Sequence, residues 1–449
     1  MGHPAHGTYG GGRVASQGLR TWGALGAAAM VALFVSVGPA LAGRPVAVHY
    51  ASPSALRGLH VLSRIDALRV AKVETDDVAA LRRRPGVLSV RRVVSRLRLG
   101  EPGLESQEGG APLEWQFAAT RAHLVPDWVE RAASSVTIAV VDTGADLAAP
   151  DLAAKAPLTH NAATGGDTVD DADGHGTFVA SIAAGAPANG DGIAGFGGDA
   201  RLMVVQANRG GTTFTDVDEA AAIVWAVDHG ARIVNLSIGG PQTSAVERQA
   251  VSYAIAKGVL LVAAAGNYGQ AGNRLSYPAA LIGDAGLVVG ASTAAGERAP
   301  FSTAARYVSI AAPGVRVLGA LSPTAPTSVF PRATVRGATG VYGFGTGTSY
   351  AAPQVAGAAA LVWGVDTNRS AAEVIRILER TAAGDGTRTA QLGWGVLDVA
   401  SAVARATGVP IPQAAVRAQT AALHTRHRVV TRLIVPAAPS RRLTPQALR

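Results

Sequence analysis

Short, continuous apolar runs alternate with segments of helical periodicity from about Leu113 onward. Two helical segments, 216–229 and 245–257, lie between these runs, and the second ends at Gly258. The runs have the character of strands buried on both faces and cover residues 136–141, 202–206, 233–236, 260–264 and 287–289. This alternation predicts an α/β fold with a doubly wound, mostly parallel sheet flanked by helices. In such folds, catalytic groups gather beyond the C-terminal ends of the strands.

A smaller unit precedes this body. Residues 44–98 predict a small α/β domain with a helix at 76–84 and strands at 46–50, 68–74 and 87–93. Residues 101–112 are rich in Gly, Pro, Ser and Glu and predict an exposed connector, where a protease would cut. Residues 322–338 predict a surface loop. Residues 409–449 contain no acids, are rich in Pro, Ala and Arg, and predict a disordered basic tail.

The N-terminus has the pattern of a secretory signal peptide. Arg13 and Arg20 precede an apolar run, and Ala40, Leu41 and Ala42 form an exit typical of cleavage after residue 42. An uncleaved membrane anchor is the alternative, because residues 22–42 are nearly long enough to span a bilayer. No later segment is that long and apolar, so a secreted or cell-envelope protein without a membrane span is expected. The chain has no cysteine, which excludes a cysteine nucleophile and a thiolate metal site.

The net charge of +9 is unevenly distributed. Residues 1–100 carry 14 Lys and Arg against 4 Asp and Glu, residues 101–408 carry 19 against 27, and residues 409–449 carry 7 against none. The central body is therefore acidic, which argues against nucleic-acid binding.

Three glycine-flanked segments carry an aspartate, a histidine and a serine in the chain order of one known catalytic triad. Asp142 directly follows the first predicted strand, His175 lies at the start of a helix, and Ser349 begins another helix. A serine hydroxyl needs a base to become a nucleophile, and imidazole titrates in a suitable range. The carboxylate would hold the imidazole in the correct tautomer. Asn267 follows the strand at 260–264, so its amide could join the Ser349 N–H as an oxyanion donor.

Competing interpretations explain fewer of these residues. Asp142, Thr143 and Gly144 also match the active-site turn of aspartic proteases, but that chemistry needs two carboxylates and only one such turn occurs. An esterase elbow would need glycine where Ala351 stands. Taken alone, each triad residue could be an ordinary cap or turn residue.

Five ordered motifs together resemble the subtilisin-like serine proteases (subtilases, peptidase family S8). They are Val-Val-Asp-Thr-Gly ending at Gly144, Gly-His-Gly-Thr from Gly174, Asn-Leu-Ser-Ile-Gly-Gly from Asn235, Ala-Ala-Gly-Asn ending at Asn267, and Gly-Thr-Ser-x-Ala-Ala-Pro ending at Pro353. The resemblance spans roughly residues 115–406. It implies an exported enzyme with an N-terminal propeptide.

Carried over by position, the resemblance implies nucleophile Ser349, base His175, orienting Asp142 and oxyanion donor Asn267. It further implies that Ser237, Ile238 and Gly239 pair with substrate backbone, and that Ala264, Ala265 and Gly266 form a wall of the pocket for the residue before the cut. Tyr350 and Gln354 depart from the Met and His usual in the family, and Tyr350 could reshape the cleft. No cofactor is required. A structural calcium near Asp191 is left open, because residues 189–198 are similar to the family's metal-binding loop but short.

These observations predict a monomeric, secreted serine endopeptidase that cuts polypeptides through an acyl-enzyme. The expected parts are a signal peptide at 1–42, a propeptide and connector at 43–108, a catalytic domain at 109–408 and the tail at 409–449. Residues 43–100 carry 12 basic against 4 acidic residues, so the propeptide would dock on the acidic body as a folding aid and inhibitor. A binding protein on an inactive subtilase scaffold is the non-enzymatic alternative.

Overall fold

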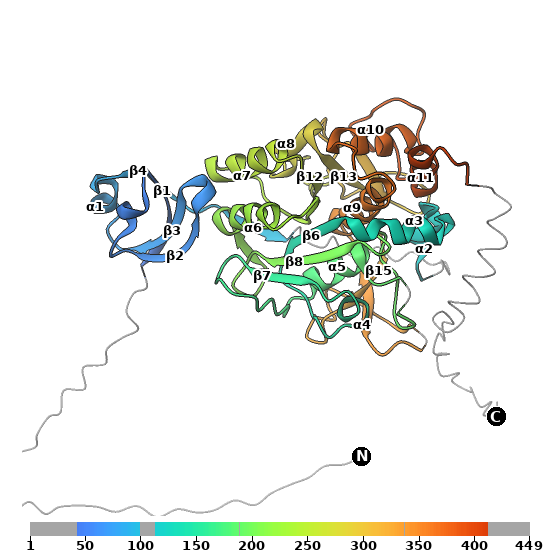
Figure 1. The fold of residues 1–449 in the computed structure, drawn as a ribbon, viewed down its shortest axis with the longest axis horizontal. Coiled ribbons are helices and arrows are strands. Elements are labelled where there is room, and N and C mark those ends of the chain that lie inside the picture. The colour runs from blue at the N-terminus through green and yellow to red at the C-terminus, as the bar shows by residue number, and fades with distance from the viewer. Residues whose placement is uncertain (1–42, 99–112, 188, 336, 412–449) are drawn as a thin grey trace, which may run out of the picture. The chain divides into compact units, whose positions relative to one another are not determined.

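The computed structural model describes residues 43–98, 113–187, 189–335 and 337–411 (Figure 1). The predicted signal peptide, the connector and nearly all of the basic tail lie outside these ranges. No helix in the described part of the chain is both apolar enough and long enough to cross a bilayer.

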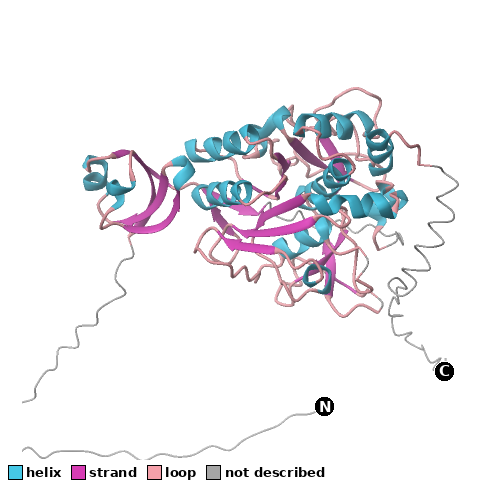
Figure 2. Ribbon diagram, in the orientation of Figure 1, coloured by secondary structure: helices cyan, strands magenta, loops and turns pink. Residues whose placement is uncertain are grey.

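The centre of the main body is a seven-stranded sheet in which every neighbouring pair is parallel (Figures 1 and 2). In sheet order the strands are β14 (Ile310–Pro313), β13 (Leu287–Ser292), β12 (Leu260–Ala264), β10 (Ile233–Leu236), β6 (Thr137–Asp142), β8 (Arg201–Gln206) and β7 (Leu158–Asn161). The five predicted strands are the central ones. β7 and β14 at the two edges were not predicted.

Helices cover both faces of this sheet, because side chains along each strand alternate between two cores. In β6, Ile138 and Val140 belong to one core and Ala139 and Val141 to the other. The first core is completed by α3 (Asp127–Ala132), α5 (His175–Ala184), α9 (Thr348–Gly364), α10 (Ala371–Thr381) and α11 (Val399–Thr407). The second is completed by α6 (Asp216–Asp228), α7 (Ala245–Ala256) and α8 (Ala279–Ile282). The predicted α/β architecture is therefore confirmed.

Shorter elements complete the body. A three-stranded sheet contains β15 (Val317–Leu321), β17 (Val341–Gly345) and β16 (Arg332–Ala333), and two more helices are α2 (Trp115–Ala119) and α4 (Pro150–Ala153). The segment 322–338 is not wholly a surface loop as expected. Phe330 is fully buried and its ring stacks on Phe178 of α5, because the apolar surface of α5 would otherwise be left open.

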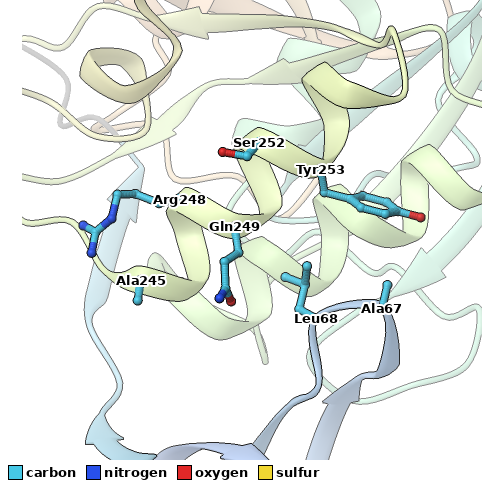
Figure 3. Close-up of a pocket in the computed structure, with 7 residues that line it drawn as sticks. All are labelled: Ala67, Leu68, Ala245, Arg248, Gln249, Ser252 and Tyr253. Carbon is cyan, nitrogen blue, oxygen red and sulfur yellow. The ribbon is translucent and has the colours of Figure 1, made fainter.

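Residues 43–98 form an antiparallel sheet of order β2-β3-β1-β4 with one helix, coloured blue in Figure 1. The elements are β1 (Arg44–Tyr50), β2 (His60–Ile65), β3 (Val70–Thr75), α1 (Val78–Arg83) and β4 (Val87–Arg92). Strand β2 was missed in the sequence. Ala47, Ile65 and Val70 join the same core as α6 and α7. A hollow between the Ala67–Leu68 turn and α7 borders this contact (Figure 3).

The last strand of this N-terminal segment leaves its own sheet. β5 (Ser95–Arg98) lies between β11 (Ile238–Gly239) and β9 (Thr213–Thr215) and is antiparallel to both. Gly239 pairs with residue 97 and Ile238 with residue 98. The segment predicted to pair with substrate backbone is therefore already paired with a strand of this chain.

Candidate active site

Asp142 and His175 meet at the C-terminal edge of the central sheet. Asp142 is the last residue of β6, and His175 is the first residue of α5. His175 Nδ1 lies 2.7 Å from Asp142 Oδ1, and both side chains are fully buried. Asp142 Oδ1 also accepts a hydrogen bond of 2.8 Å from the Thr143 N–H. With Nδ1 donating to the carboxylate, Nε2 is the basic nitrogen of the neutral imidazole.

Asp171 fixes the geometry of this pair, and sequence reasoning missed it. Its buried carboxylate accepts hydrogen bonds from Thr143 Oγ1 at 2.8 Å, from the Gly174 N–H at 2.8 Å and from the Thr177 N–H and Oγ1 at 2.8 and 2.6 Å. These donors come from the end of β6 and the start of α5, so one side chain ties together the segments that carry Asp142 and His175. Asp171 lies three residues before the N-cap residue Gly174, so no N-cap pattern in the sequence marks it.

Ser349 lies in the first turn of α9, where backbone N–H groups have no carbonyl partner within the helix. Its hydroxyl donates to the Ser237 carbonyl at 3.1 Å, and the Ser237 hydroxyl donates to the Ser349 carbonyl at 2.8 Å. These reciprocal bonds place the predicted nucleophile beside the start of the predicted substrate-pairing edge. Helix α9 also packs against α5, which carries His175.

Asn267 is held from its carbonyl side. Its Oδ1 accepts from the Thr348 N–H at 3.0 Å and from Thr348 Oγ1 at 2.9 Å. Two donors on Oδ1 assign the other end of the amide as the NH₂ group, which is the end an oxyanion donor needs. Thr348 precedes Ser349, so Asn267 is linked directly to the segment that carries the predicted nucleophile.

The predicted pocket wall, Ala264–Gly266, runs from the end of β12 toward the same segment. The Gly266 N–H donates to Thr348 Oγ1 at 3.3 Å. Gly266 has φ +104°, and a Cβ there would lie 2.9 Å from Ser276 Cβ, so only glycine fits. Ala264 and Ala265 are buried in the two cores on either side of the sheet.

Tyr350, the residue expected to be able to reshape the cleft, lies in the core beside His175. Its ring is fully buried, with centroids 4.6 Å from that of Phe178 and 5.6 Å from that of His175. Gly345 makes room for it, because a Cβ there would lie 2.6 Å from the ring. Gln354 is buried and donates to the carbonyls of Pro313 and Tyr350 at 2.6 and 2.7 Å.

The loop around Asp191 lies beside the buried acid Asp151 of α4 but offers few side-chain ligands. Asp191 accepts from Thr339, while Asp151 accepts from the Ile193 N–H at 2.8 Å and from the Tyr342 hydroxyl at 2.9 Å. Burial raises the pKa of Asp151 to about 6, and the Asp191 charge adds to this. Within the described ranges, no group of three or more His, Asp or Glu side chains is placed to hold a metal ion.

Residues 133–395 match the model of the subtilase family. Among curated relatives, thermitase of Thermoactinomyces vulgaris is 34% identical over 269 residues, which is 60% of this chain and 88% of thermitase. Subtilisin DY of Bacillus licheniformis is 33% identical over 273 residues, covering 60% of this chain and 91% of that protein.

Solved structures share the fold. Fervidolysin from Fervidobacterium pennivorans, a keratinolytic enzyme related to subtilisin, matches with a TM-score of 0.65 and 23% identity over 83% of this chain and 61% of its own. A protease from Pseudoalteromonas arctica matches with a TM-score of 0.55 and 24% identity over 66% of this chain and all of its own. The matched family region is more than half of the chain and includes every residue discussed above for the site. The chain belongs to the subtilase family and is a subtilisin-like serine endopeptidase.

Proposed function

We propose that this protein is a secreted endopeptidase that hydrolyses peptide bonds through an acyl-enzyme formed on Ser349, and that it matures by removal of its N-terminal segment. The observation that carries the proposal is the buried 2.7 Å contact between His175 Nδ1 and Asp142 Oδ1. A histidine oriented in this way has one nitrogen committed to a carboxylate and the other basic, which is what activation of a serine hydroxyl requires.

In the proposed reaction, His175 Nε2 takes the Ser349 proton as Oγ attacks the substrate carbonyl carbon. His175 then gives this proton to the leaving amine, and the C–N bond breaks to leave an ester on Ser349. Water attacks the ester with His175 again as base, which releases the acid and restores the hydroxyl. Asp142 stabilises the imidazolium that forms in each half of the reaction.

Asn267 and the Ser349 N–H are the proposed donors to the oxyanion. The bonds from Thr348 orient the Asn267 amide before substrate arrives, so little reorganisation is needed in the transition state. Removing one such donor costs about 2.7–4 kcal/mol of barrier in subtilisin. Ser237–Gly239 would pair with substrate backbone as an added strand, with Ala264–Gly266 beside the residue before the cut.

Residues 43–108 are the proposed propeptide. Two observations support an inhibitory role: β5 occupies the edge proposed for substrate, and basic side chains of this segment contact acids of α6. Lys72 Nζ lies 2.6 Å from Asp218, and Arg91 Nη1 lies 2.8 Å from Asp216. These pairs match the opposite charges of the two segments. Cleavage after β5 would free the edge once the segment dissociates.

The test is the full chain with Ser349→Ala. If the chain processes itself, this variant accumulates uncut near residues 95–113, while the wild type matures and digests casein. Normal maturation of the variant would mean that another protease makes the cut.

Inhibitors separate the protease chemistries. A serine-directed acylating inhibitor should abolish casein digestion at pH 8, and an aspartic-protease inhibitor should have no effect at pH 8 or pH 4. The opposite pattern favours the aspartic-protease interpretation, and a mature protein that leaves casein intact favours a binding protein. Mass spectrometry of the form recovered from the medium tests secretion and the maturation point together.

We further propose that no cofactor is required for catalysis and that a calcium ion stabilises the loop near Asp191. Asp151 is fully buried beside the Asp191 charge, and Glu114 Oε1 is buried without a hydrogen-bond partner in the described structure. Carboxylate and carbonyl oxygens are the ligands that calcium prefers. Because few side chains converge there, backbone carbonyls of the loop would supply the remaining ligands.

A further inference from the structure

Arg96 is a fully buried cation of the N-terminal segment. It belongs to β5, and its side chain is fully buried, as are those of Glu219 and Glu247. Its Nε lies 3.1 Å from Glu219 Oε2, and its Nη2 lies 2.8 Å from Glu247 Oε1. A third bond runs from Nη1 to the Ser95 carbonyl at 3.3 Å. One guanidinium is therefore enclosed by two carboxylates.

The two carboxylates come from the catalytic body and not from the segment that carries Arg96. Glu219 lies in the first turn of α6, and Glu247 lies in the first turn of α7, where its capping box with Ser244 fixes it. Both helices belong to the region that matches the family. The acidic pair therefore stays in the body when the N-terminal segment leaves.

The Glu219 and Glu247 carboxylates together favour the binding of a cation. Burial disfavours the charge of Arg96, but the charges of Glu219 and Glu247 outweigh it and raise the arginine pKa. Burial, together with the charge of Glu247, raises the pKa of Glu219 well above its usual range. Two buried carboxylates side by side are unfavourable until a positive group lies between them. A planar guanidinium, with several N–H donors, can reach both at once.

Strand register relates this pocket to the bond that is cut. Residues 97 and 98 pair with Gly239 and Ile238, so β5 runs antiparallel toward Ser237, whose carbonyl accepts the Ser349 hydroxyl. A substrate strand in the place of β5 would bring the residue after the Ile238 partner level with Ser237 and the nucleophile. The residue in the position of Arg96 is then the fourth residue on the acyl side of the cut.

We propose that Glu219 and Glu247 form a specificity subsite that selects an arginine four residues before the bond that is cut. The inference rests on the proposed function, since it uses the same nucleophile and the same edge for substrate. It assigns a substrate class, namely polypeptides with arginine at that position, and Arg96 occupies the subsite until the N-terminal segment is released.

The test uses matured wild-type enzyme and quenched fluorescent peptides that differ only at the fourth residue before the cut, with Arg, Gln or Leu there. We expect kcat/KM for the Arg peptide to exceed that for the Gln and Leu peptides by at least about tenfold, as expected for a buried, charge-assisted pair. Equal rates within about twofold, or a preference for Leu, would overturn the subsite while leaving the proposed function intact. A protein that cuts none of the peptides contradicts the proposed function, and the subsite with it.

Substitutions of Glu219 and Glu247 test whether these two residues cause the preference for the Arg peptide. Glu247→Gln and Glu219→Gln should each reduce the Arg-to-Gln ratio toward one, mainly by slowing cleavage of the Arg peptide. Glu373→Gln on α10 is the matched control, because Glu373 is exposed and Gln can keep its capping box with Ser370. An unchanged ratio in both pocket variants would overturn the assignment. The wild-type peptide series decides the question even if a variant fails to fold.

Discussion

Among single residues, Asp142 allows a test of whether the orientation of His175 matters for catalysis. Asp142→Asn keeps the shape of the side chain but changes the partner of His175 Nδ1, so the wrong tautomer is favoured. We expect kcat to fall on the order of 10⁴-fold. The measurement is kcat on one peptide after an added protease has removed the N-terminal segment.

Asp146→Asn is the matched control, because Asp146 lies in the same turn but its carboxylate bonds to the Ala148 N–H, outside the triad. Its activity should stay close to that of the wild type. A loss of less than tenfold for Asp142→Asn would contradict the role of the pair.

The residues of the site also show what sequence can and cannot predict. Asp142, His175 and Ser349 could be singled out as candidates because each lies in a short motif at the boundary of a strand or helix. The burial of Tyr350 could not be predicted, because its ring packs against Phe178, which is distant from it in the sequence. Asp171 could not be found either, because its hydrogen bond with Thr143 is a tertiary contact between segments 28 residues apart.

Among the elements, β3 and α6 are joined by a buried ion pair in addition to their apolar contacts. Asp218→Asn would leave the Lys72 ammonium buried without a counter-charge, which costs about 3–5 kcal/mol. In the uncut Ser349→Ala background, we expect faster hydrogen exchange in β1–β4 than in the parent. Asp228→Asn, exposed near the other end of α6, is the control. Unchanged exchange in the Asp218 variant would argue against charge-dependent docking.

If calcium binds at the loop near Asp191, the thermal stability of the protein should depend on calcium. A bound ion raises the free energy of unfolding by about 2.7 kcal/mol at a hundred times its Kd. We therefore expect the Tm to fall when a chelator removes calcium and to recover when calcium is added back. Asp191→Asn should reduce this response, and the exposed Asp385→Asn should not. A wild-type Tm that is the same with calcium and with chelator would contradict the proposed calcium site.

At the scale of the whole molecule, stability should depend on pH through Glu130. Burial, helped by the charges of Asp127 and Asp199, raises the Glu130 pKa from 4.5 to about 7. The folded state therefore binds this proton more tightly than the unfolded state, and stability is lost as pH rises from about 4.5 to 7.

Glu130→Gln removes this titration. Its free energy of unfolding should fall less than that of the wild type across the same window, by about 1–3 kcal/mol. Urea unfolding at pH 5 and pH 7.5 measures the difference. Lys155, whose pKa burial lowers to about 8, contributes with the opposite sign above this window, so the comparison stays below pH 8. Parallel pH profiles for the two proteins would contradict the prediction.

The architecture was largely predictable because strands buried on both faces appear as continuous apolar runs. The edge strands β7 and β14 were not, since short edge strands carry weak patterns. Nor could sequence place β5 between β9 and β11, because that pairing joins segments more than a hundred residues apart. The acidic pocket around Arg96 was missed for the same reason.

Covalent labelling of the matured enzyme with a serine-directed phosphonylating reagent, followed by peptide mass spectrometry, tests directly whether Ser349 is the nucleophile. We expect one adduct, on the Ser349 hydroxyl, formed in step with the loss of peptidase activity. Activity that disappears without an adduct on Ser349, or an adduct there that leaves activity intact, would show that Ser349 is not the nucleophile.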